Sequence, residues 1–293
     1  MKFLEKNPMI MIVVGVLGIS LSSIFVKFSA APSAVTAAYR LMWTVIILTP
    51  VVFSKKETRQ ELKSIRKKSV ILSIVSGVFL AIHFVLWFES LSHTSVASST
   101  TIVCTEVIWV ALGYLFVLKG KLGVKPIVAI AITLLGSVLI AYSDSGGESS
   151  LYGDVLALLA AIAVAVYTLI GGVVRENVST TVYTYIVYVS CMVVLIFTCL
   201  IQGHNIFGFG ISAPVVGLLL SLFSTIFGHS IFSWCLKYFS PSFVSASKLC
   251  EPVVSALFAV FIFAEIPTLI QVTGAVLVIG GVLFYSLVEK NNG

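Results

Sequence analysis

Long apolar stretches, separated by short polar segments, follow one another along almost the whole chain. A helix needs about 20 apolar residues to cross the hydrocarbon core of a bilayer. Ten stretches reach or approach that length, at residues 8–28, 32–53, 70–91, 95–118, 125–142, 152–174, 181–201, 213–236, 241–263 and 268–288. The pattern therefore predicts an all-α integral membrane protein with ten transmembrane helices, which we number one to ten in chain order.

The composition agrees with a membrane protein and disfavours several other classes. Of the 293 residues, 59% are hydrophobic and only 10% are charged, whereas soluble domains carry about 25% charged residues. The chain contains no Walker loop, no HExxH and no GxSxG motif. Its five cysteines lie inside predicted helices without metal-ligand spacing. We therefore expect neither an enzyme nor an ATP-driven pump, and no cofactor or metal ion.

Basic residues are concentrated in the segment between helices two and three: Lys55, Lys56, Arg59, Lys63, Arg66, Lys67 and Lys68. Cytoplasmic loops of membrane proteins carry an excess of lysine and arginine. When the predicted crossings are counted from this segment, both termini are expected in the cytoplasm and the protein in the plasma membrane as a multi-pass protein. The net charge of +6 is explained in this way, so we expect no nucleic-acid partner.

The two halves of the chain resemble each other at an offset of about 146 residues. This offset aligns His83-Phe84 with His229-Ser230, and Cys104-Thr105-Glu106 with Cys250-Glu251-Pro252. The sequence therefore predicts one membrane domain built from two five-helix repeats, at residues 1–144 and 145–293.

An odd number of helices per repeat inverts the second repeat relative to the first. Many secondary transporters are built from inverted repeats, and their binding sites lie near the middle of the membrane between the halves. Helices four and nine, which carry Glu106 and Glu251, are then expected to run antiparallel at corresponding depths.

Several motifs resemble the ten-helix EamA-type branch of the drug/metabolite transporter superfamily. They are the stretch HFVLWFESL at residues 83–91, the sequence Glu251-Pro252-Val253, and Glu265 followed by Gln271. The first half departs from the pattern, because Lys119 stands where an outer glutamate would be. The resemblance implies a secondary transporter of small metabolites, often an exporter, with a small-molecule substrate and the lipid bilayer as partners. We expect a monomer or a homodimer.

Three charged residues, Glu106, Lys248 and Glu251, fall near the centres of predicted helices. Each such charge costs roughly 2.5–3.5 kcal/mol on membrane-insertion scales, so these residues must be paired or line a wet cavity. Lys248 and Glu251 are three residues apart and can form an ion pair on one helix face. Pro252 also leaves the carbonyl of Lys248 without its helical hydrogen bond.

Helical spacing places further polar and aromatic residues on the faces that carry these charges. Helix eight has Ser221, Thr225, His229 and Ser233 at intervals of four residues, and helix three has His83 and Trp87 four residues apart. Trp109 lies beside Glu106 on helix four, where it could contact an aromatic or cationic ligand. The predicted substrate-binding residues are therefore Glu106, Trp109, His83, Trp87, His229, Ser233, Lys248 and Glu251.

Two further charges, Arg40 and Glu89, lie at similar depths towards the predicted outer side. Arg40 needs a partner at that depth, and Glu89 is the nearest candidate. We interpret the two residues as an outer gate.

A cavity with both acids and a base suits a small zwitterion such as an amino acid. Lys248 would attract its carboxylate, and Glu106 or Glu251 its amine. The acids could also bind a proton, and His83 and His229 could relay it, which makes the proton a candidate coupling ion. The main alternative is a cation or multidrug exporter in which Glu106 binds an amine. A lipid flippase and an integral membrane enzyme are the remaining alternatives.

Overall fold

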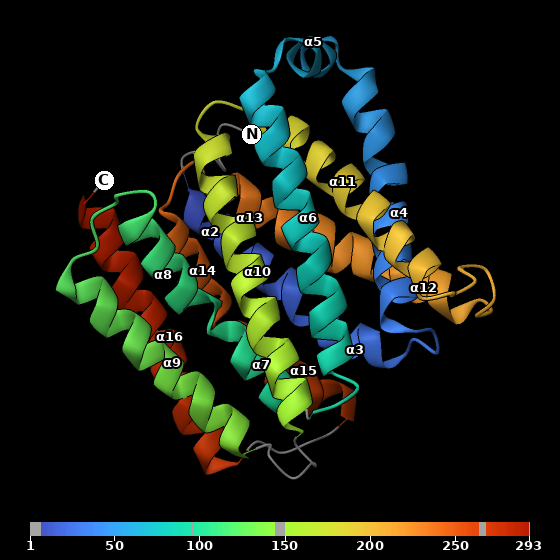
Figure 1. Ribbon diagram of the computed structural model, residues 1–293. Coiled ribbons are helices and arrows are strands. Elements are labelled where there is room, and N and C mark those ends of the chain that lie inside the picture. The colour runs from blue at the N-terminus through green and yellow to red at the C-terminus, as the bar shows by residue number, and fades with distance from the viewer. Residues whose placement is uncertain (1–6, 95, 144–149, 264–267, 293) are drawn as a thin grey trace.

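The computed structural model describes the backbone of residues 7–94, 96–143, 150–263 and 268–292, and every regular element in these ranges is a helix (Figure 1). The first half contains α2 (Pro8–Ser20), α3 (Ser22–Lys27), α4 (Ser33–Ser54), α5 (Lys56–Ser64), α6 (Lys67–Ser90), α7 (Val96–Cys104), α8 (Glu106–Phe116) and α9 (Val124–Ser143). The second half contains α10 (Leu151–Arg175), α11 (Thr180–Ile201), α12 (Ser212–Leu219), η1 (Leu220–His229), α13 (Ser230–Cys235), α14 (Pro241–Lys248), α15 (Glu251–Phe263) and α16 (Leu269–Asn292).

Each of the ten predicted helices is present, although four of them are interrupted. Helix one is α2 with α3, helix four is α7 with α8, helix eight is α12 with η1 and α13, and helix nine is α14 with α15. Eight spans are long and apolar enough to cross a membrane, and Val124–Ile140 is a shorter apolar helix. The ninth helix is divided at its charged residues. The fold is therefore an all-α multi-pass membrane bundle, as the hydropathy pattern predicts.

The packing of the helices follows the internal repeat. Helices one and six occupy corresponding places in the two repeats, as do helices three and eight. Helix one packs on helix eight, and helix six likewise packs on helix three. Helices two and seven, four and nine, and five and ten pack directly on each other, and each of these pairs is unchanged by the exchange. This pattern agrees with two inverted five-helix repeats that share one core.

The pair of α9 and α16, the symmetry-related helices five and ten, forms one flank of the bundle (Figure 1). A Cβ atom added to Gly136 would lie 2.6 Å from the carbonyl oxygen of Gly274, and one added to Gly274 would lie 2.7 Å from that of Gly136. Only glycine permits this approach of the two backbones. Small residues at such contacts are typical of helix association in membranes, where packing rather than the hydrophobic effect holds helices together.

Helices four and nine are both interrupted directly before their acidic residue. Thr105 separates α7 from Glu106, the first residue of α8, and Leu249 with Cys250 separates α14 from Glu251, the first residue of α15. At both places the backbone is tightened, with an amide donating to the carbonyl three residues earlier, as from Cys250 to Ser247. Each carboxylate therefore lies at the positive end of a half-helix.

Helix eight contains ten residues of π-helix, η1, which the sequence pattern does not predict. A π-helix has a wider turn than an α-helix, yet all four residues of the predicted polar stripe are buried: Ser221, Thr225, His229 and Ser233. The stripe is therefore directed into the bundle, with a local change of helical twist.

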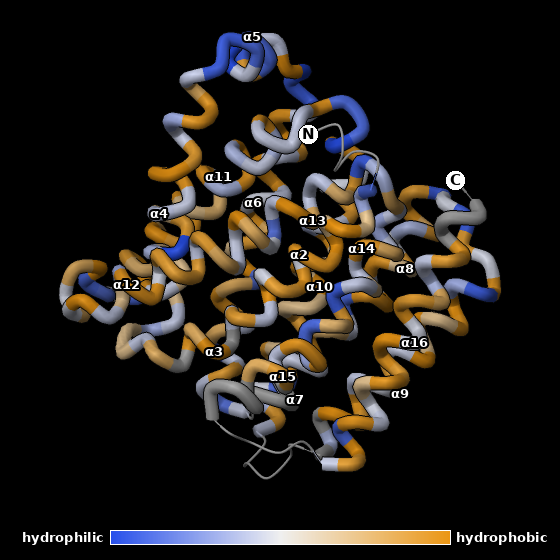
Figure 2. Tube along the Cα trace, turned by 180° about the vertical axis from the view of Figure 1, so that it is seen from behind, coloured by the Kyte–Doolittle hydropathy of each residue, from blue (hydrophilic) through white to orange (hydrophobic). Residues whose placement is uncertain are grey.

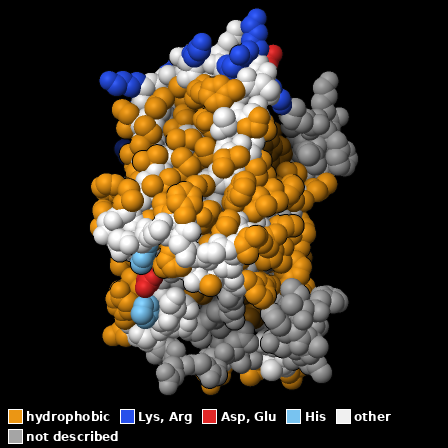
Figure 3. All heavy atoms as spheres, turned by 90° about the vertical axis from the view of Figure 1, so that its right-hand side faces the viewer, with side chains coloured by type: hydrophobic (Ala, Val, Ile, Leu, Met, Phe, Trp, Pro, Cys, Tyr) orange, Lys and Arg blue, Asp and Glu red, His pale blue; other side chains and the backbone are white. Residues whose placement is uncertain are grey.

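The two ends of the bundle differ in charge. Both termini lie at the same end as α5 (Figure 1), and α5 is hydrophilic while the spanning helices are mostly hydrophobic (Figure 2). Lysine and arginine side chains gather at one end of the face seen in Figure 3, above a flank of hydrophobic side chains. With both termini at the basic end, the chain crosses the bundle an even number of times, which fits ten helices.

Cysteine labelling tests the sidedness of the two ends. Ser64→Cys, in α5, should react only with reagents that cross the membrane, whereas Ser92→Cys, in the loop after α6, should react with an impermeant maleimide applied to whole cells. The native cysteines are buried or half-buried, so the unmodified protein gives the background. Labelling of both variants from one side would contradict the ten-helix topology.

Candidate functional site

A small cavity near the middle of the bundle is lined by residues from both repeats. Its free volume is about 40 Å³, enough for about three water molecules at ~10–15 Å³ each. The residues that line it are Ile19, Ser22, Arg40, His83, Trp87, Thr100, Val103, Glu106, Val164, Ser224, His229, Lys248 and Glu251. We call this space the central cavity. It contains six of the eight predicted substrate-binding residues.

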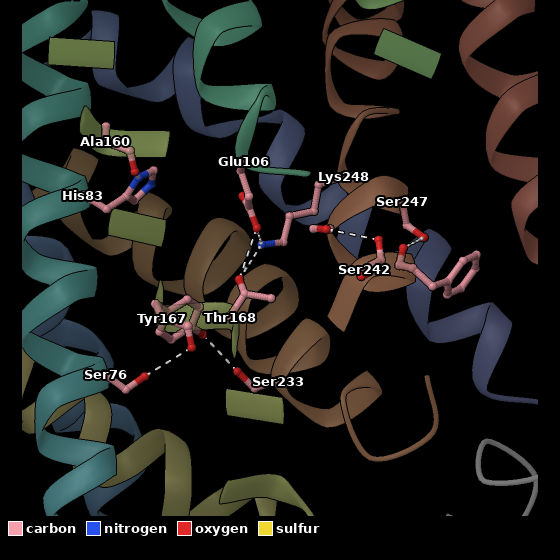
Figure 4. Close-up of polar contacts among 12 residues, drawn as sticks. Ser76, His83, Glu106, Ala160, Tyr167, Thr168, Ser233, Ser242, Ser247 and Lys248 are labelled. Atoms are coloured by element: carbon pink, nitrogen blue, oxygen red, sulfur yellow. Dashed lines mark hydrogen bonds and ion pairs between the residues drawn. The ribbon is translucent and has the colours of Figure 1, made fainter. Parts of the chain in front are cut away.

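An ion pair between the two repeats forms one wall of the cavity (Figure 4). The Nζ atom of Lys248 lies 2.7 Å from Oε1 of Glu106, and the hydroxyl of Thr168 donates to the same oxygen at 3.1 Å. The side chains of Lys248 and Glu106 are only 11% and 8% exposed. The predicted pairing of Lys248 with Glu251 is therefore wrong, because Lys248 points across the repeat interface rather than along its own helix.

Arg40 is completely buried and faces the cavity. Its Nε atom donates to the Thr225 hydroxyl at 2.7 Å, and Nη1 donates to the Ser22 hydroxyl at 3.4 Å. The guanidinium carbon lies 4.2 Å from the centroid of the Phe84 ring, a cation–π contact. The remaining Nη2 group has no hydrogen-bond partner among the described residues.

The structure does not bring Arg40 and Glu89 together. Glu89 is 44% exposed and pairs with His93, Nε2 to Oε1, at 3.2 Å. It lines a different and larger pocket, which also contains Tyr152 and His204. Glu89 follows Trp87 by two residues on α6, so the two side chains point to opposite sides of that helix. The predicted outer gate between Arg40 and Glu89 is not formed in this conformation.

Glu251 lies at the cavity on the first turn of α15. Within the described part of the chain, its carboxylate makes no hydrogen bond or ion pair. The other acid, Glu106, has two partners. The two acids therefore occupy equivalent backbone positions, each at the start of a half-helix, but differ in their side-chain contacts.

The two predicted histidines both reach the cavity, in different settings. Nδ1 of His83 lies 3.1 Å from the carbonyl oxygen of Ala160 and, because a carbonyl only accepts, it carries a hydrogen. The His83 ring stacks on Trp87 with a centroid separation of 5.8 Å. His229 contacts the edges of Phe84 and Tyr167, and its Nδ1 has no partner in the described structure.

Unpaired polar atoms are concentrated at this one place. Of the buried side-chain atoms that lack a hydrogen bond among the described residues, five belong to cavity-lining residues: Arg40 Nη2, Trp87 Nε1, Thr100 Oγ1, Ser224 Oγ and His229 Nδ1. Buried polar groups in native proteins are nearly always bonded, so exceptions call for an explanation such as a ligand or water. Five exceptions around one cavity indicate a binding site.

Two predicted residues, Trp109 and Ser233, lie outside the cavity lining. Trp109 is half-buried, and its indole nitrogen has no described partner. Ser233 belongs to a polar layer nearer to α5, in which its hydroxyl bonds to that of Tyr167 at 2.9 Å (Figure 4). The same layer contains a bond of 2.7 Å between the hydroxyls of Ser76 and Tyr183. We call these contacts the inner polar layer.

Sequence reasoning missed several contributors to the site. Thr168 contacts both members of the ion pair, and Thr100 and Ser224 line the cavity and have unpaired hydroxyls. Single hydroxyls in apolar helices commonly bond to their own backbone, so these gave no distinct signal. The buried Thr168, one residue after Tyr167, could have been found from the repeat, because Ser22 occupies the matching place in helix one. Glu265, which the resemblance also singled out, lies outside the described residues.

Comparison with known families agrees with this architecture. The sequence model of the EamA-like transporter family matches the chain twice, over residues 6–142 and 151–287. The chain belongs to the EamA-like transporter family. It is therefore a membrane transporter, and the two matched segments fit the inverted-repeat fold.

Individual relatives of the transporter are distant. An uncharacterized transporter of Clostridium kluyveri is 26% identical over 210 residues, covering 69% of this chain and 68% of the relative. The uncharacterized transporter YxxF of Bacillus subtilis is 27% identical over 227 residues, covering 73% and 69%. A solved crystal structure superimposes with a TM-score of 0.79 at 15% identity, covering 98% of both chains. That likeness concerns the fold alone.

The ion pair between the repeats makes a testable prediction about stability. Lys248→Met leaves the Glu106 carboxylate buried without its base, so we expect a loss of about 3–5 kcal/mol, the cost typical of breaking a buried pair. The double variant Glu106→Gln/Lys248→Met should recover much of this loss, because neither charge remains. Unfolding of the purified protein in detergent measures both.

Lys237→Met is the matched control, because Lys237 is exposed at the end of helix eight. It should leave stability within a few tenths of a kcal/mol. If Lys248→Met and Lys237→Met were equally stable, the pair would not hold the repeats together.

Proposed function

We propose that this transporter is a secondary active exporter of a small zwitterionic metabolite, such as an amino acid, and that it binds its substrate in the central cavity. Alternating access of the cavity to the two sides of the membrane would move the substrate. Inverted repeats around a binding site at mid-membrane depth support this mechanism.

The observation that carries the proposal is an unpaired base and an unpaired acid in the same cavity. Arg40 presents the free Nη2 group, a donor for a carboxylate. Glu251 presents a carboxylate, an acceptor for an ammonium group. Lys248 and Glu106 neutralise each other. The groups left for a ligand therefore carry one charge of each sign.

This distribution also revises the roles that the sequence suggested. Lys248 was the expected carboxylate ligand, but it is held by Glu106 at 2.7 Å. Arg40 takes that role in the proposal, because its guanidinium is fixed by Thr225 and Ser22 and still has a free group. A fixed donor loses little conformational freedom when it binds an anion.

A cation or multidrug exporter has less support. That alternative requires Glu106 to bind the amine of the substrate, but Glu106 is already neutralised by Lys248. Trp109, which would contact the cation in that alternative, does not line the cavity. The cationic Arg40 faces the cavity and would repel a simple amine in surroundings of low effective dielectric.

The closed state of the cavity supports alternating access. Small-molecule sites have volumes of roughly 300–1,000 Å³, far above the 40 Å³ observed here. On the side nearer to α5, the inner polar layer ties α6, α10, α11 and α13 together. The hydroxyls of Tyr188 on α11 and Ser230 on α13 add a further bond of 2.9 Å. In the proposal these contacts open to release or admit substrate on that side.

Location and orientation follow from the charge distribution. In the proposal the protein lies in the plasma membrane with α5 and both termini in the cytoplasm, because basic residues favour the cytoplasmic side. Export then moves substrate from the α5 end to the opposite end.

A ligand screen combined with two substitutions tests the substrate class. Thermal shifts of the purified protein with amino acids, amines, carboxylates and nucleosides should identify amino acids. Arg40→Lys keeps a charge but loses the guanidinium fork, and should weaken amino-acid binding about tenfold or more, the worth of one charge-assisted hydrogen bond. Glu251→Gln should weaken amino acids and spare simple carboxylates.

Trp109→Phe is the control, because Trp109 lies outside the cavity lining; it should leave amino-acid binding unchanged. If amines bound and amino acids did not, and Trp109→Phe weakened the amines, the cation-exporter alternative would replace the proposal. Flux of any ligand into proteoliposomes completes the test.

We further propose that protons are the coupling ion, with Glu251 and His229 as the cavity groups that can exchange them. Proteoliposomes loaded with a pH-sensitive dye should change their internal pH when substrate is added outside, while empty liposomes should not. Sustained substrate uptake without a change of internal pH would exclude the proton.

A further inference from the structure

The short helix α5, which joins α4 to α6, is amphipathic and docked on the bundle. Its partly buried residues Thr58, Glu61, Leu62 and the following Ile65 recur at helical spacing and face inward. Leu62 and Ile65 pack against the larger hydrophobic core. Oε1 of Glu61 accepts the backbone amide of Ser179, one residue before α11, at 2.6 Å. The orientation of α5 about its own axis is therefore fixed.

The opposite face of α5 is basic and exposed. Lys56, Arg59 and Lys63 share this face, with spacings of three and four residues. Four more exposed bases flank the helix: Lys55, Arg66, Lys67 and Lys68. None of these seven bases forms an ion pair within the described part of the chain. We call the seven residues the basic face.

The charge of the basic face is a large part of the charge of the protein. The segment has seven bases against Glu57 and Glu61, and the second acid is bound to the start of α11. Its net charge of +5 compares with +6 for the whole chain. A partner of this surface would therefore be anionic, because the described chain supplies no ion-pairing acid to it.

The position of α5 selects the kind of anion. The helix lies across the ends of α4 and α6 (Figure 1), directly after one membrane span and before the next. A helix that directly joins two consecutive spans is expected near the headgroups of the adjoining leaflet. Clusters of four to eight lysines and arginines beside a membrane span attract anionic lipids.

We propose that the basic face is a docking surface for anionic phospholipid headgroups, with Lys56, Arg59 and Lys63 in direct contact with lipid phosphates. The surface is also connected to the central cavity. The helices that α5 joins carry cavity residues, Arg40 on α4 and His83 with Trp87 on α6. Bound lipid therefore stabilises one relative position of two cavity-forming helices, whatever the substrate is.

The test uses the full-length protein purified in a neutral detergent, with phosphatidylglycerol and phosphatidylcholine as probes. Native mass spectrometry counts bound lipids, and unfolding temperature reports stabilisation. Phosphatidylglycerol should bind and stabilise, and the triple variant Lys56→Gln/Arg59→Gln/Lys63→Gln should bind it about tenfold or more weakly. These side chains make no hydrogen bond or ion pair with the described chain, so the variant should unfold at the original temperature in phosphatidylcholine.

The matched control is Lys119→Gln/Lys121→Gln/Lys125→Gln, which removes three exposed bases from the α8–α9 connection and the first turn of α9. It should keep the phosphatidylglycerol effect, as should Lys56→Arg/Lys63→Arg. If both triple variants lost phosphatidylglycerol binding equally, the lipid would only prefer positive charge in general, and the proposal would be overturned. Binding of an acidic protein or an oligonucleotide without phosphatidylglycerol binding would also overturn it.

Salt provides a measurement on the unmodified protein. The Debye length falls from about 10 Å at 0.1 M to about 3 Å at 1 M, so stabilisation by phosphatidylglycerol should be largely lost at 1 M salt. Stabilisation that persists at 1 M salt would contradict binding through the basic face. Neither result depends on which substrate the central cavity takes.

Discussion

The ion pair between Lys248 and Glu106 is the contact on which the centre of the molecule depends. A single charge at this depth is costly, so each partner requires the other. The two residues come from opposite repeats, and the contact therefore joins helices four and nine, a pair that remains the same when the repeats are exchanged. The broken helix places Glu106 at the start of α8, where the helix dipole also favours a carboxylate.

Hydropathy was sufficient to predict the helical bundle, because ten apolar stretches of about spanning length leave few other folds for the chain. It was not sufficient for the breaks within helices. Pro252 explains why helix nine is interrupted, but helix four has no proline at its break next to Thr105. The π-helical register of residues 220–229 likewise has no signal in the local sequence, and this segment packs against α2 and α4.

The site residues were predictable where burial makes a residue conspicuous, and their contacts were not. Charges in apolar helices mark Glu106, Lys248, Glu251 and Arg40 from sequence alone, and all four line the cavity. The local spacing of Lys248 and Glu251 suggested the wrong partner, because the lysine stem is long enough to reach another helix. Sequence depth also suggested Glu89 for Arg40, but depth does not determine the side of a helix on which a residue lies.

One position accounts for the different pairing of the two acids. The offset of 145 residues that relates Glu106 to Glu251 also relates Val103 to Lys248, and all four residues line the cavity. Only the second repeat has a base at this place, and only Glu106 is paired. A symmetric backbone with one asymmetric base leaves the second acid free beside Arg40. The single lysine at this place thus pairs one of the two symmetry-related acids and leaves the other available to a ligand.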